Sequence, residues 1–349
     1  MGEEIVQSVK KKLSGYREFL KGEGKEWLSD RKERSKRYAE IFSADKLDGL
    51  DESVLSGVVK ELWANIAWTN KQYVVDRVLQ SNDIGELREM FKDLLWGSDS
   101  LRHRFDRFFK RVKGLGPAQT TEIMCFARPT EFAIWNERSR RALRVLGLGN
   151  EIPVNKYRIS GEEYERFVIA AKQIEEVLKA EGVGEDLLDV DLFLYYIQLG
   201  AEQDYLRVSE VNDFDHDEVV EKLVELGAGL GFEVESERTV STGARVDVVW
   251  RAKIGNLGVI KYVFEVHKSG SIDSAILNLM KAKKDQSVQK IVIVSNKDGL
   301  DKFKKETEDL PEDFRKTISY LTVGDVLEAS NLMQKINNIL SKLELIKTM

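Results

Sequence analysis

Two acidic residues stand where a charge is costly unless it has a partner. Asp247 lies in the apolar run ARVDVVW, and Glu265 lies in the apolar run YVFEV. A carboxylate inside such a run has to be ion-paired or has to bind a cation. Both runs have the β-branched and aromatic content of strands, so the two carboxylates could converge if the strands are neighbours. The alternative is an ordinary ion pair, for instance of Asp247 with Arg245 or Arg251.

Two carboxylates that converge in this way form an oxygen site for a hard divalent cation. Mg²⁺ keeps several waters and binds through one or two carboxylates together with substrate phosphate. A bound Mg²⁺ or Mn²⁺ could lower the pKa of a water molecule and stabilise the charge that develops on a phosphodiester. The pattern therefore indicates hydrolysis of a phosphate ester as the chemistry to test.

The elements that must position these carboxylates lie in residues 213–349, where we expect the order αβββαβαβα. A helix (DEVVEKLVELGAGLG) precedes three strands, FEVESERTV, ARVDVVWRAK and VIKYVFEVHK. Helices and short apolar strands then alternate, through SIDSAILNLMKAKKD, KIVIVSN, LDKFKKETEDL and ISYLTV, to a final helix. Three strands in a meander followed by βαβ units predict a mixed sheet with helices on both sides.

This layout resembles that of the PD-(D/E)XK nuclease superfamily, which includes restriction endonucleases and archaeal Holliday-junction resolvases. The resemblance covers about 110 residues, from Asp215 to about Val323. It implies a restriction-endonuclease-like fold and a metal site at Asp247, Glu265 and Val266. It also implies a helping acidic residue in the first helix, for which the choice is Glu221, with Glu218 and Glu225 close behind.

One position departs from that pattern, because His267 stands where the family has a lysine. Alternation along a strand places Glu265 and His267 on one face and Lys268, also kept as a catalytic candidate, on the other. Three explanations stay open. His267 orients water or binds metal in place of lysine, or Lys281 or Lys284 reaches in from the next helix, or catalysis has been lost while DNA binding is kept.

The run Ser269-Gly270-Ser271 follows directly and leads into a helix. Ser271 fits an N-cap, and the backbone N–H groups around Ser269 could also bind a phosphate. The plain cap is the simpler interpretation, and Ser269 is retained as a DNA-binding candidate.

The first part of the chain reads as helical throughout, with a charged helix in residues 1–45 and a helical domain in residues 46–206. Residues 109–147 resemble a helix-hairpin-helix, because Gly114-Leu115-Gly116 separates two helical segments and Lys113 stands beside it. In that motif, glycines let backbone N–H groups approach a DNA phosphate. Gly-x-Gly also ends helices for steric reasons alone.

The segment PTEFAIWNERSRRALRVLGL resembles the one that follows the hairpin in helix-hairpin-helix DNA glycosylases. Arg140 and Arg141 fit its Arg-Arg-x-Leu helix, and Arg138 precedes them, but Asn136 occupies the position of the catalytic Asp. An amide cannot act as that carboxylate, so we expect the scaffold without glycosylase chemistry. The arginines are DNA-binding candidates, and a solvated helix face is the alternative.

Composition limits the possible ligands, redox compartment and membrane association of the chain. The net charge of −6 argues weakly against nucleic acid, although the segment from Leu101 to Arg144 is locally basic. The single cysteine, Cys125, excludes an internal disulfide and fits a reducing, cytoplasmic compartment. No signal peptide or membrane span is expected.

We therefore expect a metal-dependent DNA endonuclease of restriction or repair type, without membrane or nucleotide cofactor. A homodimer is an open alternative to a monomer. The alternative function is a catalytically inactive DNA-binding or scaffold protein of a defence or repair complex. A glycosylase is a third and weaker option, which Asn136 opposes.

Overall fold

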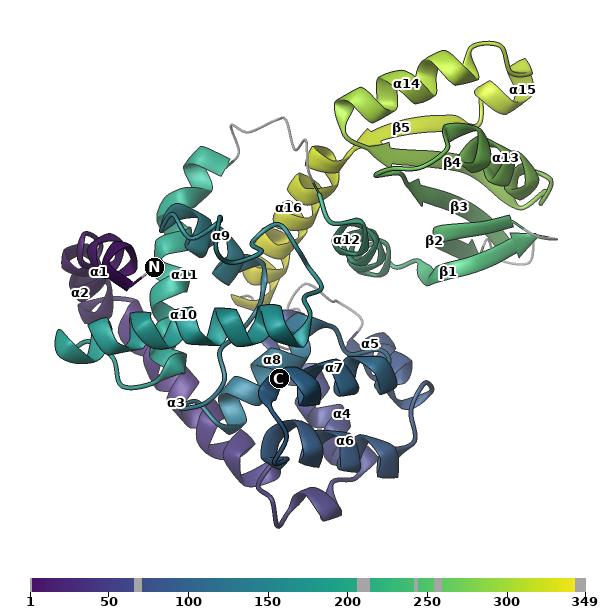
Figure 1. The fold of residues 1–349 in the computed structure, drawn as a ribbon. Helices are drawn as coiled ribbons and strands as arrows, with labels where there is room; N and C mark the ends of the chain where they lie inside the picture. The colour runs from purple at the N-terminus through teal and green to yellow at the C-terminus, as the bar shows by residue number, and fades with distance from the viewer. Residues whose placement is uncertain (1, 66–70, 206–213, 242–243, 254–258, 343–349) are drawn as a thin grey trace. The chain divides into compact units, whose positions relative to one another are not determined.

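The chain divides into two compact units in a computed structural model, which describes residues 2–65, 71–205, 214–241, 244–253 and 259–342 (Figure 1). The first unit ends at Tyr205 and the described part of the second begins at Phe214. The predicted boundary at 206–213 lies outside the described residues. The helices of the predicted 1–45 segment pack within the first unit, with α1 against α10 and α3 against α8.

All regular secondary structure in the first unit's described residues is helical, as the sequence predicts. The bounds of the helices are α1 Gly2–Lys10, α2 Leu13–Lys21, α3 Gly24–Ile41, α4 Glu52–Glu61, α5 Lys71–Leu79, α6 Ile84–Trp96, α7 Leu101–Arg111, α8 Pro117–Ala127, α9 Glu137–Val145, α10 Gly161–Ala180 and α11 Leu187–Tyr205, with short 3-10 turns at Leu47–Gly49 (η1) and Trp63–Asn65 (η2). The charged segment expected as one helix in residues 1–45 is divided into three helices, with breaks before Leu13 and at Gly22. No helix in the described ranges is long and apolar enough to cross a membrane.

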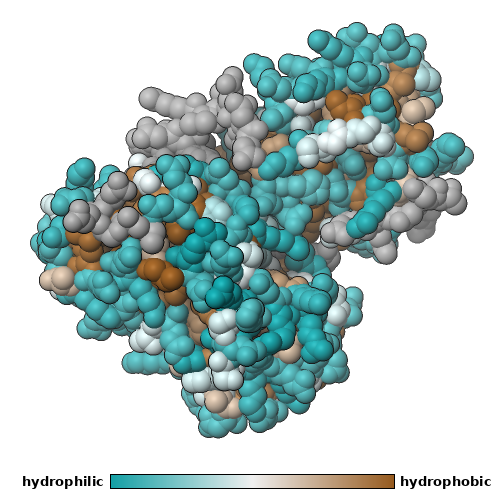
Figure 2. All heavy atoms as spheres, in the orientation of Figure 1, coloured by the Kyte–Doolittle hydropathy of each residue, from teal (hydrophilic) through white to brown (hydrophobic). Residues whose placement is uncertain are grey.

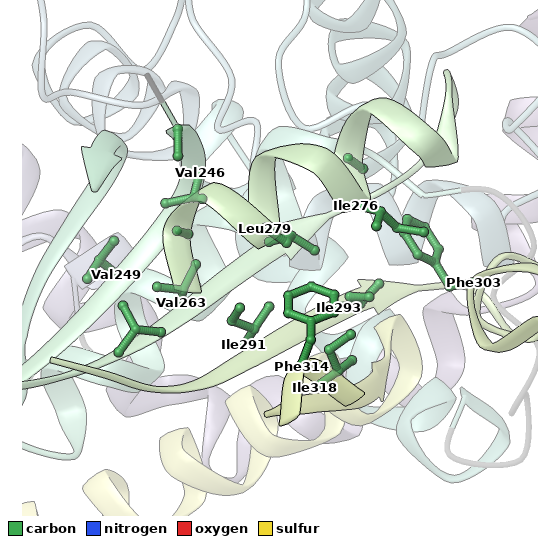
Figure 3. Close-up of a cluster of buried hydrophobic side chains, with 14 of the residues drawn as sticks. Val246, Val249, Val263, Ile276, Leu279, Ile291, Ile293, Phe303, Phe314 and Ile318 are labelled. Atoms are coloured by element: carbon green, nitrogen blue, oxygen red, sulfur yellow. The ribbon is translucent and has the colours of Figure 1, made fainter. Parts of the chain in front are cut away.

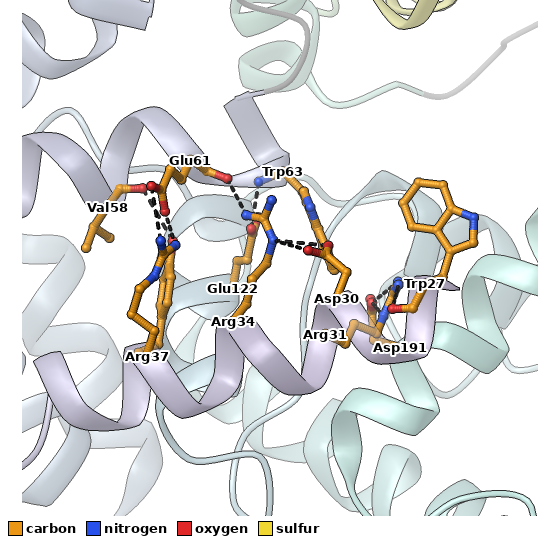
Figure 4. A network of polar contacts seen from close by, with 11 residues as sticks. Trp27, Asp30, Arg31, Arg34, Arg37, Val58, Glu61, Trp63, Glu122 and Asp191 are labelled. Atoms are coloured by element: carbon orange, nitrogen blue, oxygen red, sulfur yellow. Dashed lines mark hydrogen bonds and ion pairs between the residues drawn. The ribbon is translucent and has the colours of Figure 1, made fainter. Parts of the chain in front are cut away.

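Charged side chains are buried between α3, α8 and α11. Arg31 pairs with Asp191 at 2.8 Å, and their side chains are only 2% and 9% exposed. Figure 4 shows Arg31, Arg34 and Arg37 on successive turns of α3, directed at carboxylates and at the ring of Trp63. Burying two charges has a high desolvation cost. Removing one partner therefore lowers stability much more than replacing both with apolar residues, because it leaves one buried charge unpaired.

Glu122 of α8 is a second buried carboxylate of this region. Its two oxygens accept hydrogen bonds from the N–H groups of Trp63, at 2.6 Å, and Ala64, at 2.8 Å, so it holds the η2 turn. Burial raises the pKa of Glu122 to about 7, although the two amides and Arg34 oppose the rise. Its charged form is therefore disfavoured by desolvation even though it is hydrogen-bonded.

We predict that Asp191→Ala lowers the free energy of unfolding by about 3–5 kcal/mol, because Arg31 would remain as a buried charge without its partner. Glu185→Ala is the matched control, since Glu185 pairs with Lys32 at 3.8 Å with 83% of its side chain exposed. That control should change stability by less than about 1 kcal/mol. Urea titration followed by tryptophan fluorescence measures both, and equal losses would contradict the prediction.

A second prediction concerns pH. The folded pKa of Glu122, about 7, lies above its ordinary value of 4.5, so the folded chain holds this proton more tightly. The stabilisation is complete below pH 4.5 and is lost as the pH rises to about 7. Glu122→Gln has no titrating group at this position. Its free energy of unfolding should therefore fall by about 2–3 kcal/mol less than that of wild type over this pH interval. Urea titrations across this interval test it, and parallel pH profiles would exclude it.

The second unit has the predicted element order. Its bounds are α12 His216–Gly229, β1 Glu233–Ser241, β2 Ala244–Lys253, β3 Val259–Val266, α13 Ile272–Lys283, β4 Val288–Ser295, α14 Lys297–Thr307, α15 Glu312–Arg315, β5 Ile318–Thr322 and α16 Val323–Lys342. The strands lie in the order β1-β2-β3-β4-β5. The first two pairings are antiparallel and the last two are parallel, which makes the sheet mixed. The short helix α15 was not expected from the sequence.

One face of the sheet is covered by α13 and α14. Figure 3 shows apolar side chains of β2, β3 and β4 packed against these helices, with Val263, Leu279 and Phe303 in the cluster. Because the strand order advances in one direction from β3 to β5, right-handed crossovers place both connecting helices on the same face. The opposite face meets α12, where the indole N–H of Trp250 donates to the carbonyl of Leu223 at 3.0 Å.

Hydrophilic side chains cover most of the face seen in Figure 2. Exposed apolar side chains include Leu230, at the end of α12, and Leu277, of α13, which is normal on a folded protein. On α16, Leu332, Ile336 and Ile339 are at least half exposed, and their spacing of four and three residues puts them on one face of the helix.

Candidate metal centre

Asp247 and Glu265 lie at the end of the β2–β3 ladder, one residue beyond its last pair, Val248 with Phe264. Continuing that register would set the two acids opposite one another, and the charge of Asp247 acts on Glu265. Residues opposite one another in an antiparallel pair project from the same face of the sheet. The N–H of Val266 donates to Asp247 Oδ2 at 2.7 Å, which fixes the aspartate against β3.

Glu265 is a carboxylate that lacks part of its hydrogen bonding. Its Oε2 atom is buried and has no hydrogen-bond partner within the described residues. Burial is the largest cause that raises the pKa of Glu265 to about 8, and the charge of Asp247 is the second; His216 and the backbone of Asp247 oppose it. A buried acid beside a second acid needs either a proton or a cation.

His216 is the residue that the sequence reasoning missed. It is the first residue of α12, which Asp215 caps by accepting the N–H of Glu218. His216 Nε2 lies 3.4 Å from Asp247 Oδ2, and Nδ1 lies 3.3 Å from Asp217 Oδ1. Hydrogen bonding to Asp217 and then to Asp247 raises the pKa of His216 to about 10. The sequence DFDHDE gave no periodic signal for this, because the contact joins a helix start to a strand.

Glu221, the α12 acid expected from the sequence, stays a prediction. It follows His216 by five residues, which turns it about 140° around the helix axis. The structure brings the side chain of His216 to Asp247.

His267 is held by its own surroundings. Its ring meets the ring of Phe303 edge-on, with centroids 4.9 Å apart. Its backbone is fixed to β4, since its N–H donates to the Val294 carbonyl and its carbonyl accepts from Ser295. Burial lowers the pKa of His267, so this ring is a neutral donor, acceptor or ligand at neutral pH and not a substitute for a lysine's positive charge.

The candidate lysines lie at two different ends of the sheet. Lys268 is exposed, and its ammonium lies 5.8 Å from the ring of Phe214, next to the start of α12. Lys281 is in the last turn of α13, and Lys284 precedes Asp285, which pairs with Lys261 near the start of β3. Lys261 precedes Glu265 by four residues, or about 13 Å along a strand. The structure thus places Lys268 near the start of α12, where His216 lies. Reach of Lys281 or Lys284 to the carboxylates stays a prediction.

Ser269 is exposed in the turn before α13. Ser271 is the N-cap of that helix, and its hydroxyl accepts the N–H of Ser274 at 3.3 Å. Gly270 has a φ of +113°, which explains a glycine between the two serines.

The Gly114-Leu115-Gly116 hairpin connects α7 to α8 and is closely packed. Gly114 has a φ of +81°, and a Cβ at Gly116 would lie 2.5 Å from the Tyr157 hydroxyl. The N–H of Lys113 donates to Asn82, and that of Gly116 donates to Gln119. Within the described residues, no hydrogen bond uses the N–H groups of Gly114 and Leu115, which are the ones left for an anion.

The arginines after the hairpin do not share one surface role. Arg140 is 5% exposed, and its guanidinium is directed at the Val154 carbonyl. Arg141 pairs with Glu137, while Arg138 lies over the ring of Tyr195, 5.5 Å from its centroid. Asn136 caps α9 by accepting the N–H of Ser139, so an asparagine has a structural use at this position.

The donors at the sheet edge fit a cation held mainly by waters. The part of the chain that the structure describes contains no group of three His, Cys, Asp or Glu side chains already arranged to hold a metal ion. Two neighbouring carboxylates, one with an unpartnered buried oxygen, are nevertheless the set that Mg²⁺ or Mn²⁺ uses together with water and phosphate.

Comparison with known proteins gives no match, either to a family model, to a curated protein or to a solved structure. The structure defines the fold class: a helical unit followed by a five-stranded mixed sheet interleaved with helices.

Proposed function

We propose that the chain is a metal-dependent DNA endonuclease. The observation that carries this proposal is the closeness of Asp247 and Glu265 at the end of the β2–β3 ladder, where one buried oxygen of Glu265 has no hydrogen-bond partner within the described residues. The αβββαβ order and the mixed sheet also agree with the PD-(D/E)XK resemblance. When bound there, Mg²⁺ or Mn²⁺ supplies Lewis-acid stabilisation of a phosphodiester and lowers the pKa of a bound water.

The surrounding residues would hold the reacting groups in place. The N–H of Val266 keeps the Asp247 carboxylate oriented toward β3. His267 directly follows β3, and strand alternation would put it on the side of Glu265. As a neutral imidazole it can accept a hydrogen bond from an attacking water. Lys268 provides an exposed positive charge at the rim, suited to a phosphate of the DNA backbone.

A second candidate function is a DNA-binding protein that does not cut. The observation in its favour is that His267 replaces the family's lysine and packs against Phe303. An electrostatic group of the motif would then be missing at the position where charge develops. In this case the helical unit would account for the whole function, through the hairpin and its neighbouring basic residues.

The nuclease proposal predicts that Asp247→Asn abolishes cutting. Supercoiled plasmid incubated with wild-type protein and Mg²⁺ or Mn²⁺ should be nicked or linearised, and the variant should be slower by at least about 100-fold, the scale of losing one charge-stabilising group. Asp273→Asn is the matched control, because Asp273 is an exposed acid in the first turn of α13. It should cut at the wild-type rate.

Equal cutting by Asp247→Asn and wild type would refute the assignment. DNA that is shifted in a gel but stays intact with each metal would favour the non-cutting binder. Folding of both variants is compared by circular dichroism and urea titration.

The DNA-binding role of the hairpin predicts a change in salt dependence. Lys113 is exposed beside Gly114 and Leu115, whose N–H groups have no hydrogen-bond partner within the described ranges. Lys113→Ala should reduce the slope of log K against log salt by about one, because one phosphate contact releases about one counterion. Lys11→Ala, at an exposed lysine between α1 and α2, should leave the slope unchanged. Fluorescence anisotropy with labelled duplex measures both, and an unaltered slope for Lys113→Ala removes the hairpin from the interface.

A further inference from the structure

The position of His216 relative to Asp247 matches that of two ligands on one ion. Their Nε2 and Oδ2 atoms are 3.4 Å apart. Neighbouring ligands of an octahedral ion with bonds of about 2.1 Å lie about 3.0 Å apart. When Nε2 releases its proton to solvent, a small closing movement of either side chain would therefore place both atoms in one coordination sphere.

The other ring nitrogen of His216 has the partner that metal-binding histidines use. Nδ1 lies 3.3 Å from Asp217 Oδ1. A histidine that ligates a metal usually donates its second N–H to a carboxylate, which fixes the tautomer and the ring orientation. The His216 side chain is 38% exposed, so the ring is partly open to solvent and ions.

Glu265 supplies the third donor on the neighbouring strand. Its buried Oε2 has no hydrogen-bond partner within the described residues, and its carboxylate interacts electrostatically with both Asp247 and His216. Since the described side chains do not already form a closed three-member group, a bound ion has to draw them together by side-chain rotation.

Building on the nuclease function proposed above, we infer that His216 is a metal ligand and that the site takes a transition-metal ion, such as Mn²⁺, through mixed nitrogen and oxygen donors. Imidazole favours transition metals, whereas Mg²⁺ is bound almost entirely by oxygen atoms. Asp217 is then a positioning residue that holds the His216 ring. The competing ligand is His267, which lies two residues after Glu265 and packs on Phe303.

The decisive measurement is pulsed EPR of Mn²⁺ bound to the full chain, which detects nitrogen bonded directly to the metal. The chain has three histidines, so the source of a ¹⁴N coupling can be assigned by substitution. We expect the coupling in wild type, its loss in His216→Gln, and its retention in His267→Gln. Coupling that persists in His216→Gln, or that is absent from wild type, overturns the inference.

Affinity gives a second readout that does not depend on cutting. Titration of free Mn²⁺ followed by EPR should show at least about 10-fold weaker binding in His216→Gln and about 10-fold weaker binding in Asp217→Asn, as for outer partners of ligating histidines. Mg²⁺ affinity, measured by calorimetry, should change less. Equal losses for both metals would contradict the mixed-donor site.

The two proposals fail in different ways. If Asp247-dependent plasmid cutting occurs but Mn²⁺ shows no nitrogen coupling, the nuclease stands and His216 is not a ligand. If the coupling is present and depends on His216 but no DNA is cut, the metal site stands and the nuclease does not. Unfolding in urea verifies that His216→Gln retains the native fold, and Mn²⁺ binding by a misfolded variant is not compared.

Discussion

The second unit depends on the antiparallel register of β2 and β3. The ladder that pairs Val248 with Phe264 ends one residue before Asp247 and Glu265, and so it brings these two acids close together. A slip of one residue would move each carboxylate to the other face of its strand and separate the pair. Register is fixed here because Val263 and Val249 are buried in the core on one face, while Trp250 packs toward α12 on the other.

The rest of the sheet holds this edge in place. The parallel strands β4 and β5 follow β3 in order, and α13 and α14 cover the face that Val263 shares with the buried residues of β4. His267 also packs on this covered face, since its ring contacts Phe303 of α14 and its backbone N–H donates to β4. The carboxylates therefore lie between the packed apolar core and the exposed loops. At this position they can be partly buried and still be reached by an ion from solvent.

The helical unit shows a different use of charge. Its acidic and basic groups at α3, α8 and α11 are buried in pairs or held by backbone amides, as with Arg31 and Asp191 and with Glu122. The basic residues after the hairpin are likewise divided, because Arg140 is buried and Arg141 pairs with Glu137, while Lys113 remains exposed. A count of positive charges along the sequence therefore overstates the surface available to DNA.

The sequence by itself determined the element order of the second unit, the helical character of the first and the presence of Asp247 and Glu265 in apolar strands. These are local properties, set by hydrophobic period, strand composition and turn residues. Tertiary structure alone decided that His216 lies beside Asp247, 31 positions later in the chain, and that Lys284 lies near the far end of β3. It also decided that Arg140 is buried although its neighbours look like a solvated face. Such contacts join elements distant in sequence, and no local pattern encodes which side chains meet when a helix packs on a sheet.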